Sequence, residues 1–424
     1  NQGNWQSAIA STETMIRRPG PYNEIKVLDF GQVLAGPYAS MILADLGADV
    51  VKIEGPEGDA TRHYVPPDID GHSPYYLFVN RNKKSLVLNL KSEEGRAAVI
   101  AMTERADVVV ENFRTGVMDR LGIGYDILKE VNPRLVYCAI SGYGRSGPFA
   151  HRAGYDPIAQ AESGLMSMSG EPDGSPTRIG ISVIDMITGT FAAQAIGAAL
   201  YARRDTGQGQ YVEANLFGSA ANMLGNFGAQ SLMLADNPSR AGSGSQAAQP
   251  SGVYNSIDGQ FMLTIGNQRM YARFCKDVIL RPDMLTDGRY ATNAERLRNK
   301  VTLSNELEAV FATRTNKEWL ALMDENAIPA GEINSVYDGL HSSFADAINL
   351  VTSAPHSTLG NLKTMMPSYS LSETPVRAPV GAPVLGEHTR EVLRDWAFFN
   401  SARIENMVSM GFAIVPTNPI SEDF

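Results

Sequence analysis

The sequence predicts an α/β protein with a mostly parallel sheet, because short apolar strands alternate with helical stretches through its first half. The first strand, at 25–30 (IKVLDF), runs into Gly31 and a helical stretch at 38–46, and a second strand follows at 48–54 (ADVVKIE). Pro37 falls near the first turn of that helix, where its missing N–H is harmless. These segments predict a compact βαβ unit.

The alternation continues as far as residue 216. Ser92 is expected to cap a helix that ends at residue 105, since Glu93 and Glu94 suit the positive end of the helix dipole. The other elements expected here are strands at 84–90, 106–112, 135–141 and 210–216, helical pieces at 115–121 and 125–132, a polar loop at 59–75 and a glycine-rich turn at 142–148.

The segment 252–326 predicts a second, smaller α+β domain. Its Asp258-Gly259 dipeptide favours a turn between two strands, and Thr315 with Glu318 forms a capping box that opens a helix. The elements expected in this domain are strands at 252–255 and 261–265, and helices at 269–279, 301–312 and 315–325. The preceding segment, rich in alanine, glycine and serine, is typical of an interdomain linker.

Composition excludes several classes of partner. A net charge of −10 supplies no basic field for nucleic acid, and no apolar run stands out as a membrane span of about 18 residues. Cys138 and Cys275 lie in apolar segments, which indicates buried free thiols and a reducing compartment. We expect a cytoplasmic protein, with a mitochondrial or other organelle matrix as the alternative. Residues 1–20 are polar and read as a disordered leader or tag.

The familiar cofactor motifs are missing from the sequence. Gly31 and Gly36 do not make the G-x-G-x-x-G turn of a dinucleotide site, and there is no Walker A sequence and no G-x-S-x-G elbow. The six histidines are scattered without metal-ligand spacing, so no metal site is predicted. Any catalysis is therefore expected from carboxylates and oriented amides.

Asp185 is the strongest catalytic candidate. It stands between an apolar approach at 179–184 and a helical run crowded with alanine and glycine that ends at Arg203 and Arg204. A carboxylate in such surroundings costs several kcal/mol of desolvation unless something holds it. The residues leave two interpretations open, a helix N-cap and a chemical role.

Ten segments closely resemble the class III coenzyme A-transferases, the group that contains formyl-CoA transferase and carnitine CoA-transferase. The matching segments are IKVLDFGQVLAGPYASMILADLGADVVKIE, NRNKKSLVLNLKSEEG, ADVVVENF, MDRLGIGY, NPRLVYCAISGYG, GYDPIAQAESGLMS, the Asp185 stretch, TGQGQYVEANL, IPAGEINSV and VGAPVLGEHTREVL. They occur in the family's order from about residue 22 to residue 400. The chain is therefore identified as a member of this family.

The resemblance implies a domain plan and a quaternary structure. The expected parts are a large Rossmann-like CoA-binding domain at 21–225, a linker and glycine-rich loop at 226–251, the small α+β domain at 252–326, and a return segment at 327–424 that completes the large domain. In this family two chains thread through one another as interlocked rings, so a homodimer is expected.

The resemblance also implies a reaction. Asp185 matches the family's nucleophilic aspartate, whose carboxylate attacks an acyl-CoA thioester to give a mixed anhydride and then an aspartyl-CoA thioester. The acceptor acid repeats the sequence in reverse. Coenzyme A is then a substrate of acyl-CoA metabolism, and neither ATP, metal nor a permanently bound cofactor is required.

Other positions carry over as candidates for lining the CoA site. They are Leu34, Ala35, Leu88, Asn89, Lys91, Asn112, Phe113, Arg114, Arg120, Tyr155 and Asp156. Arginine suits the phosphates of CoA because its guanidinium makes paired, charge-assisted hydrogen bonds. Arg81, Lys83 and Lys84 are further cations, for which a solvated loop is the favoured interpretation. The sequence departs from the family at Gly55, where some transferases carry arginine, and in the serine-diluted glycine loop at 242–246.

Two rival functions stay open. The α-methylacyl-CoA racemases resemble this chain even to an aspartate at position 185, but they pair it with histidine where Tyr155 stands. A tyrosine with a pKa near 10 is a poor base for an α-proton, which favours the transferase. The other rival is a non-catalytic CoA-binding subunit of a heteromeric transferase, in which Asp185 serves only as a cap.

Overall fold

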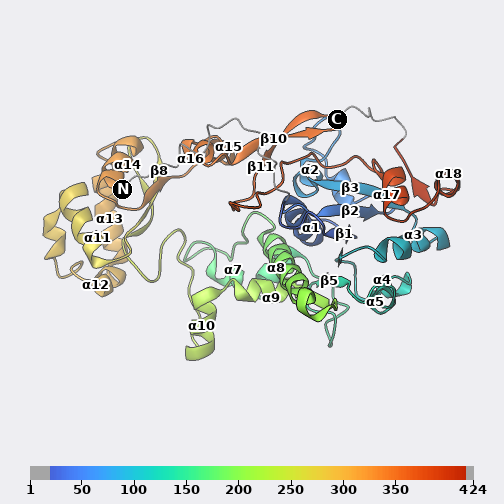
Figure 1. The fold of residues 1–424 in the computed structure, drawn as a ribbon. Helices are drawn as coiled ribbons and strands as arrows, with labels where there is room; N and C mark the ends of the chain where they lie inside the picture. Colours follow the sequence, from blue (N-terminus) through green and yellow to red (C-terminus); the bar gives the residue numbers. More distant parts are fainter. Residues whose placement is uncertain (1–19, 417–424) are drawn as a thin grey trace. The chain divides into compact units, whose positions relative to one another are not determined.

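The computed structural model describes residues 20–416, so the predicted leader lies, apart from Gly20, outside the described residues. The described chain forms two compact units (Figure 1). The first unit comprises residues up to Tyr155 together with Ile184–Ser219 and the stretch from Asn349 onward, and the second comprises Asp156–Val183 and Ala220–Ile348. This division differs from the predicted plan, because 156–183 groups with the second unit and the return begins at Asn349.

A seven-stranded sheet organises the first unit, in the order β12-β3-β2-β1-β4-β5-β6. Its strands are β1 (Lys26–Asp29), β2 (Asp49–Glu54), β3 (Lys83–Leu88), β4 (Val108–Glu111), β5 (Val136–Ser141), β6 (Tyr211–Asn215) and β12 (Ala413–Ile414). All neighbours pair in parallel except β12, which runs antiparallel to β3. The predicted α/β fold with a mostly parallel sheet is therefore confirmed.

Helices cover both faces of this sheet, because successive strand residues point to opposite sides. Val27 on β1 packs with α1 (Ala35–Asp45) and α8 (Val183–Thr206). Leu28, the next residue, belongs to the core under the other layer, formed by α3 (Glu93–Thr103), α4 (Val117–Arg120), α5 (Tyr125–Val131), α17 (Thr389–Asp395) and α18 (Ser401–Ser409). The result is a three-layer α/β/α sandwich.

Helix α8 packs tightly against α1. A Cβ atom added at Gly189 would lie only 2.7 Å from the backbone oxygen of Ala35, so this position admits no side chain without movement of α1. Among the described residues α8 alone is long and apolar enough to cross a membrane by length and composition, with a window of mean hydropathy 1.4. The sequence predicts no apolar run that stands out as a membrane span, so this helix differs from that expectation. The sheet explains the composition, because the apolar face of α8 packs into the core of the first unit.

The segment 59–75, expected to be a polar loop, contains a 3-10 turn at Ala60–His63, and α2 (Pro74–Val79) begins at its end. Ser73 caps α2 through its side chain, and Pro74 occupies the first helical position. The first unit also contains an antiparallel hairpin of β10 (Val351–His356) and β11 (Gly360–Met365).

The second unit contains an antiparallel sheet of β7 (Ser251–Asn255), β8 (Gln260–Thr264) and β9 (Ala330–Glu332). The predicted capping box is present, with Thr315 and Glu318 bonding reciprocally at the start of α14 (Asn316–Glu325). Helices α11 (Gln268–Arg273), α12 (Asn293–Arg298) and α13 (Lys300–Phe311), a π-helical turn at Phe274–Val278 and a 3-10 turn at Pro282–Leu285 complete this group. The remaining helices are α6 (Asp156–Glu162), α7 (Leu165–Met168), α9 (Leu216–Asn222), α10 (Gly225–Leu234), α15 (Val336–Leu340) and α16 (Ser343–Ala347).

Candidate active site

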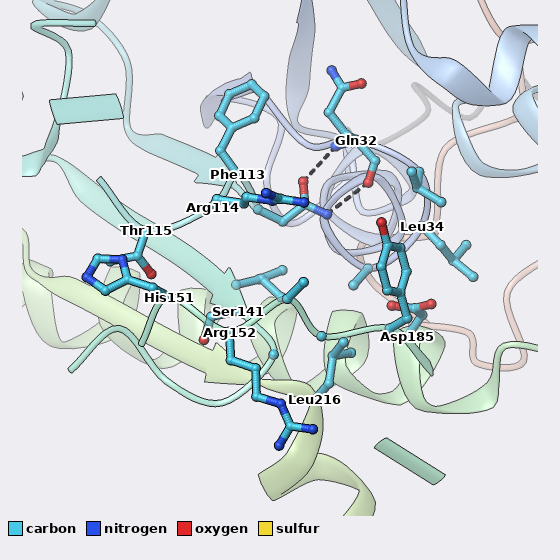
Figure 2. A pocket seen from close by; sticks show the side chains of 18 of the residues that line it. Gln32, Leu34, Phe113, Arg114, Thr115, Ser141, His151, Arg152, Asp185 and Leu216 are labelled. Atoms are coloured by element: carbon cyan, nitrogen blue, oxygen red, sulfur yellow. Dashed lines mark hydrogen bonds between the residues drawn. The ribbon is translucent and has the colours of Figure 1, made fainter. Parts of the chain in front are cut away.

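A pocket of about 230 Å³ lies at the carboxyl ends of the central strands of the first unit. From β1, the strands β2 and β3 are added on one side of the sheet, and β4, β5 and β6 are added on the other. The strand order therefore reverses between β1 and β4. Open parallel sheets bind ligands at this switch point. The loops that line the pocket are 32–35 after β1, 112–115 after β4, and 141–142 and 150–155 after β5; Leu216 after β6 and Asp185 on α8 complete it (Figure 2).

Asp185 is a half-buried residue in the first turn of α8. The helix begins at Val183, so Asp185 is a helical residue, and the N-cap interpretation is wrong. A carboxylate in the first turn still lies close to the positive end of the helix dipole, which favours its ionised form. The preceding Ile184 is fully buried, whereas Asp185 lines the pocket. The structure therefore presents a carboxyl group, partly open to solvent, to whatever the pocket binds.

The loop after β1 is bonded to the loop after β4. Asn112 Oδ1 accepts the backbone N–H of Gln32 at 2.7 Å, and Asn112 Nδ2 donates to the backbone oxygen of Gln32 at 2.8 Å (dashed in Figure 2). One amide side chain thus fixes the spacing of two pocket walls. Val33 has a positive φ of 62°, and its N–H donates to the Asp59 carboxylate at 3.3 Å.

A buried ion pair, Lys52 with Asp59, is hydrogen-bonded to the same loop after β1. Lys52 Nζ donates to Asp59 Oδ2 at 2.8 Å and to the backbone oxygen of Gly31 at 2.7 Å, and both charged side chains are fully buried. Burial by itself lowers the pKa of Lys52, but the carboxylates of Asp59, Asp29 and Glu54 outweigh it, and the pKa is raised. Lys52 is therefore held as a cation where the loop after β1 begins.

Lys83 is also a structural cation. Its Nζ donates to Asp29 Oδ2 at 3.0 Å and to the backbone oxygen of Pro37 at 2.8 Å. Burial lowers the pKa of Lys83 to about 8, although Asp29 opposes the shift. Asp29 in turn accepts the N–H of Gly31 at 2.8 Å, which ties this pair to the pocket loop as well.

The other two predicted loop cations differ from the solvated state expected for them. Arg81 is buried and makes a paired contact with Asp45, at 3.0 and 2.6 Å. Lys84 lies between Asp49, at 3.2 Å, and Glu391, at 3.1 Å. Sequence alone does not show these partners, because the carboxylates come from other elements.

The structure brings part of the predicted CoA-lining set together and separates the rest. Those that share the pocket with Asp185 are Leu34, Ala35, Asn112, Phe113, Arg114 and Tyr155. Leu88, Asn89, Lys91 and Arg120 belong to the same unit but do not line this pocket. Leu88 is fully buried in the sheet core, so its side chain offers no surface to a ligand. Asp156 begins α6 in the second unit, where it is buried and accepts a hydrogen bond from Gln160 at 2.6 Å.

Several pocket residues had not been singled out from the sequence. They are Gln32, Thr115, Ser141, His151, Arg152 and Leu216. In the view of Figure 2, Asp185 and Leu34 lie at one end and His151 and Thr115 at the other, with Arg114 between them. Their position in the sequence could have indicated them, because they lie at or just after the carboxyl ends of β1, β4, β5 and β6, where parallel sheets bind ligands. In the described part of the chain, no group of three or more histidine, cysteine or acidic side chains is placed to hold a metal ion.

Comparisons with known proteins identify the relatives of this chain. The model of the family described as CoA-transferase family III matches residues 22–389. Succinyl-CoA:glutarate CoA-transferase of Mus musculus is 37% identical over 392 residues, covering 92% of this chain and 90% of the relative. Acetyl-CoA:oxalate CoA-transferase of Acetobacter aceti is 38% identical over 394 residues, covering 91% of this chain and 98% of the relative. The crystal structure of a CAIB/BAIF family protein from Brucella suis superposes with a TM-score of 0.81 at 33% identity, covering 89% of this chain and 100% of that one.

Proposed function

This chain belongs to CoA-transferase family III, and we propose that it transfers CoA from an acyl-CoA thioester to a dicarboxylic acid through covalent intermediates on Asp185. The observation that carries the proposal is the carboxylate of Asp185 in the switch-point pocket, together with Asn112, Arg114 and Leu34. The names of two relatives pair succinyl-CoA with glutarate and acetyl-CoA with oxalate. Both acceptors are dicarboxylic acids, which supports that substrate class.

The first half of the reaction releases the donor acid. A carboxylate oxygen of Asp185 attacks the thioester carbonyl, the carbon–sulfur bond breaks, and a mixed anhydride and CoA thiolate result. The thiolate then attacks the Asp185 carbonyl of the anhydride, which expels the donor as a free carboxylate and leaves an aspartyl-CoA thioester.

The second half repeats these steps with the acceptor. Its carboxylate attacks the aspartyl thioester, and the released CoA thiolate attacks the acceptor's carbonyl in the new anhydride. Asp185 leaves as a carboxylate and is regenerated. Every step exchanges one activated acyl group for another, so the sequence balances without ATP, a redox partner or a resident cofactor.

The chain's own groups suit these steps. The first turn of α8 favours the ionised, nucleophilic form of Asp185. Leu34 and Leu216 place apolar surface beside the pocket, which removes water from the carboxylate once a ligand is bound. Arg114 is an exposed cation on the same pocket and is suited to a phosphate or to the second carboxylate of the acyl group.

The racemase alternative predicts exchange of the substrate's α-hydrogen with solvent. Tyr155 lines the pocket and is 65% exposed, and its phenol is a weak base at neutral pH. We expect the purified protein to move CoA from succinyl-CoA to glutarate or oxalate in D₂O. No deuterium should enter the α-position of 2-methylacyl-CoA under the same conditions.

Mass spectrometry of the CoA esters measures both quantities in one experiment. Rapid α-deuteration without acyl exchange would support the racemase. A protein that binds CoA but catalyses neither process until a second chain is added would support the non-catalytic subunit.

We also propose a homodimer. Helix α10 exposes Leu232, Met233 and Leu234, at 89%, 80% and 71% of their surface. Val336 on α15 and Phe344 on α16 are 83% and 82% exposed. Large apolar side chains left this exposed are typical of residues that bind a partner chain, which supports association. The interlocked form implied by the family resemblance would make the dimer resistant to dilution, because threaded chains separate only on unfolding.

Sedimentation velocity at nanomolar protein tests this proposal. We expect a single dimeric species whose sedimentation coefficient does not change with concentration. A reversible shift to monomer on dilution would contradict the interlocked form.

Buried free thiols support action in a reducing compartment, the cytoplasm or an organelle matrix. Cys138 is fully buried, and burial raises the pKa of its thiol to about 12. Cys275 is buried in the core of the second unit. Subcellular fractionation that recovered the protein from a secreted fraction would overturn this assignment.

A further inference from the structure

One carboxylate oxygen joins two walls of the pocket. Glu111 is the last residue of β4, and Arg145 lies in the loop after β5. Nη2 of Arg145 donates to Glu111 Oε2 at 2.9 Å, and the two side chains are only 10% and 4% exposed. The same Oε2 accepts the backbone N–H of Phe113, a pocket residue, at 2.8 Å. The Glu111–Arg145 pair therefore anchors the loop after β4 to the loop after β5.

Further hydrogen bonds hold Arg145 to two neighbouring strands, β5 and β6. Arg145 Nη2 also donates to the backbone oxygen of Ile140 at 2.9 Å, and the backbone N–H of Arg145 donates to Glu213 Oε1 at 2.9 Å. A second hydrogen bond links the loop after β4 to the loop after β5: the hydroxyl of Thr115 donates to the backbone oxygen of Ala150 at 2.5 Å. Thr115 and Ala150 both line the pocket.

A second cavity, of about 430 Å³, is lined by Glu111 and Arg145 together with Thr115. The charged and titratable groups around Glu111 are Arg145 after β5, Asp119 on α4, Tyr125 and Asp126 on α5, Tyr137 and Cys138 on β5, and Tyr211 and Glu213 on β6. Burial raises the pKa of Glu111 to about 7, because lost hydration outweighs the attraction of Arg145 and the bond from Phe113.

We propose that Glu111 and Arg145 are positioning residues that set the affinity of the pocket for the CoA moiety, and that protonation of Glu111 weakens this affinity. The inference rests on the proposed function, since it takes the pocket of Asp185 as the CoA site. Neither side chain lines the pocket of Asp185, so we propose no direct contact between them and the substrate. Both act through Phe113 and the loop at 150–155.

The direction of the pH effect follows from the bond between the two side chains. A charge-assisted hydrogen bond is roughly twice as strong as a neutral one. Ionised Glu111, which dominates above its pKa, holds Arg145 and Phe113 together, and neutral Glu111 holds them less firmly. The pH dependence of folding stability has the opposite sign to that of CoA affinity. Because the folded pKa is raised, the stability contributed by Glu111 is present below its unfolded pKa and is lost as pH rises through the folded value.

The test is calorimetric titration of the full-length protein with coenzyme A at about pH 6, 7 and 8. The variants are Glu111→Gln, Arg145→Met and the double substitution. Glu111→Gln retains an oxygen acceptor and removes the titration, while the ligand's own phosphates titrate equally in every protein. Arg203→Met is the matched control, because Arg203 pairs with Asp107 at 2.7 Å just before β4 begins, at the end of that strand opposite Glu111.

We expect the wild-type Kd for CoA to rise about fivefold more than that of Glu111→Gln between about pH 8 and about pH 6. At about pH 8, Arg145→Met should weaken CoA binding and raise KM for succinyl-CoA about tenfold, with kcat changed less than about threefold. The double variant should bind no more weakly than Arg145→Met, because the two side chains act as one unit. Arg203→Met should bind CoA as the wild type does at each pH.

Three results would overturn the inference: a Glu111→Gln protein with the wild-type pH dependence, an Arg145→Met protein with the wild-type Kd, or additive effects in the double variant. If Arg145→Met does not fold, Glu111→Gln carries the test. It keeps an oxygen that accepts from Arg145 but leaves that buried guanidinium without a counter-charge, so its free energy of unfolding is measured at about pH 8 alongside the titration. A wild-type protein that bound no CoA would instead overturn the proposed function.

Discussion

Replacing Asp185 by asparagine is expected to lower the turnover of CoA transfer at least about 10³-fold, equivalent to ~4 kcal/mol of transition-state stabilisation. A neutral amide cannot form the anhydride, because it is a far weaker nucleophile than a carboxylate. The fold should survive. Asp185 lies in the first turn of α8 and is half-buried, so losing its interaction with the helix dipole costs about 1 kcal/mol or less.

The control for this prediction is Asp185→Ala. Since Asp185 is not the N-cap, both variants should unfold within about 1 kcal/mol of the wild type, and both should be inactive. Steady-state rates with succinyl-CoA and glutarate, with thermal unfolding alongside, measure the two effects. A folded Asp185→Asn protein that kept more than about a tenth of wild-type turnover, with hydrolysis back to aspartate excluded by mass, would refute the nucleophile assignment.

The second large effect concerns stability. Lys52→Met is expected to lower the free energy of unfolding by about 3–5 kcal/mol, because it leaves the fully buried carboxylate of Asp59 without its cation. It also removes the hydrogen bond from Nζ to the backbone oxygen of Gly31, so the loop after β1 should loosen and KM for acyl-CoA should rise. Urea unfolding near neutral pH measures the stability change.

A matched control lies on the neighbouring strand. Lys84 also pairs with carboxylates, but its side chain is 29% exposed, so Lys84→Met should cost about 1 kcal/mol or less. The double variant Lys52→Met/Asp59→Asn should recover part of the lost stability, since it buries no unpaired charge. Equal losses for Lys52→Met and Lys84→Met would contradict the role of the buried pair.

The strands of the large sheet could be read from the sequence because they are apolar on both faces. Val108, Val109 and Val110 on β4 alternate between the two cores and are all fully buried, so the run is continuously apolar. The start of α8 was placed too late. Val183 and Ile184 are β-branched and favoured an extended approach, but they form the first turn of the helix, with Ile184 in the interior.

The buried cations could not be predicted from the sequence. Lys52, Lys83 and Arg81 look like solvated residues when read along the chain. Their partners Asp59, Asp29 and Asp45 come from a loop, a strand and a helix that only the fold brings to them. Without those pairings, the desolvation penalty argues against burying any of the three.

The candidate site was predicted in part. Asp185 and Asn112 came from the resemblance to the family, and the structure places both on one pocket. Leu88 matched the family pattern equally well, yet its side chain points into the sheet core. A motif match identifies a position in the chain and not the face that its side chain occupies. Gln32 was missed because its contribution, a pair of hydrogen bonds with Asn112, joins residues that are 80 positions apart.

Chemical trapping of the covalent intermediate tests the central claim most directly. Trypsin is expected to release residues 179–203, a peptide in which Asp185 is the only carboxylic side chain. The protein is incubated with succinyl-CoA, quenched with hydroxylamine, digested and analysed by mass spectrometry. The account predicts a hydroxamate on this peptide, dependent on succinyl-CoA and absent from Asp185→Asn. Active protein whose peptide stayed unmodified, or a hydroxamate on a different peptide, would contradict it.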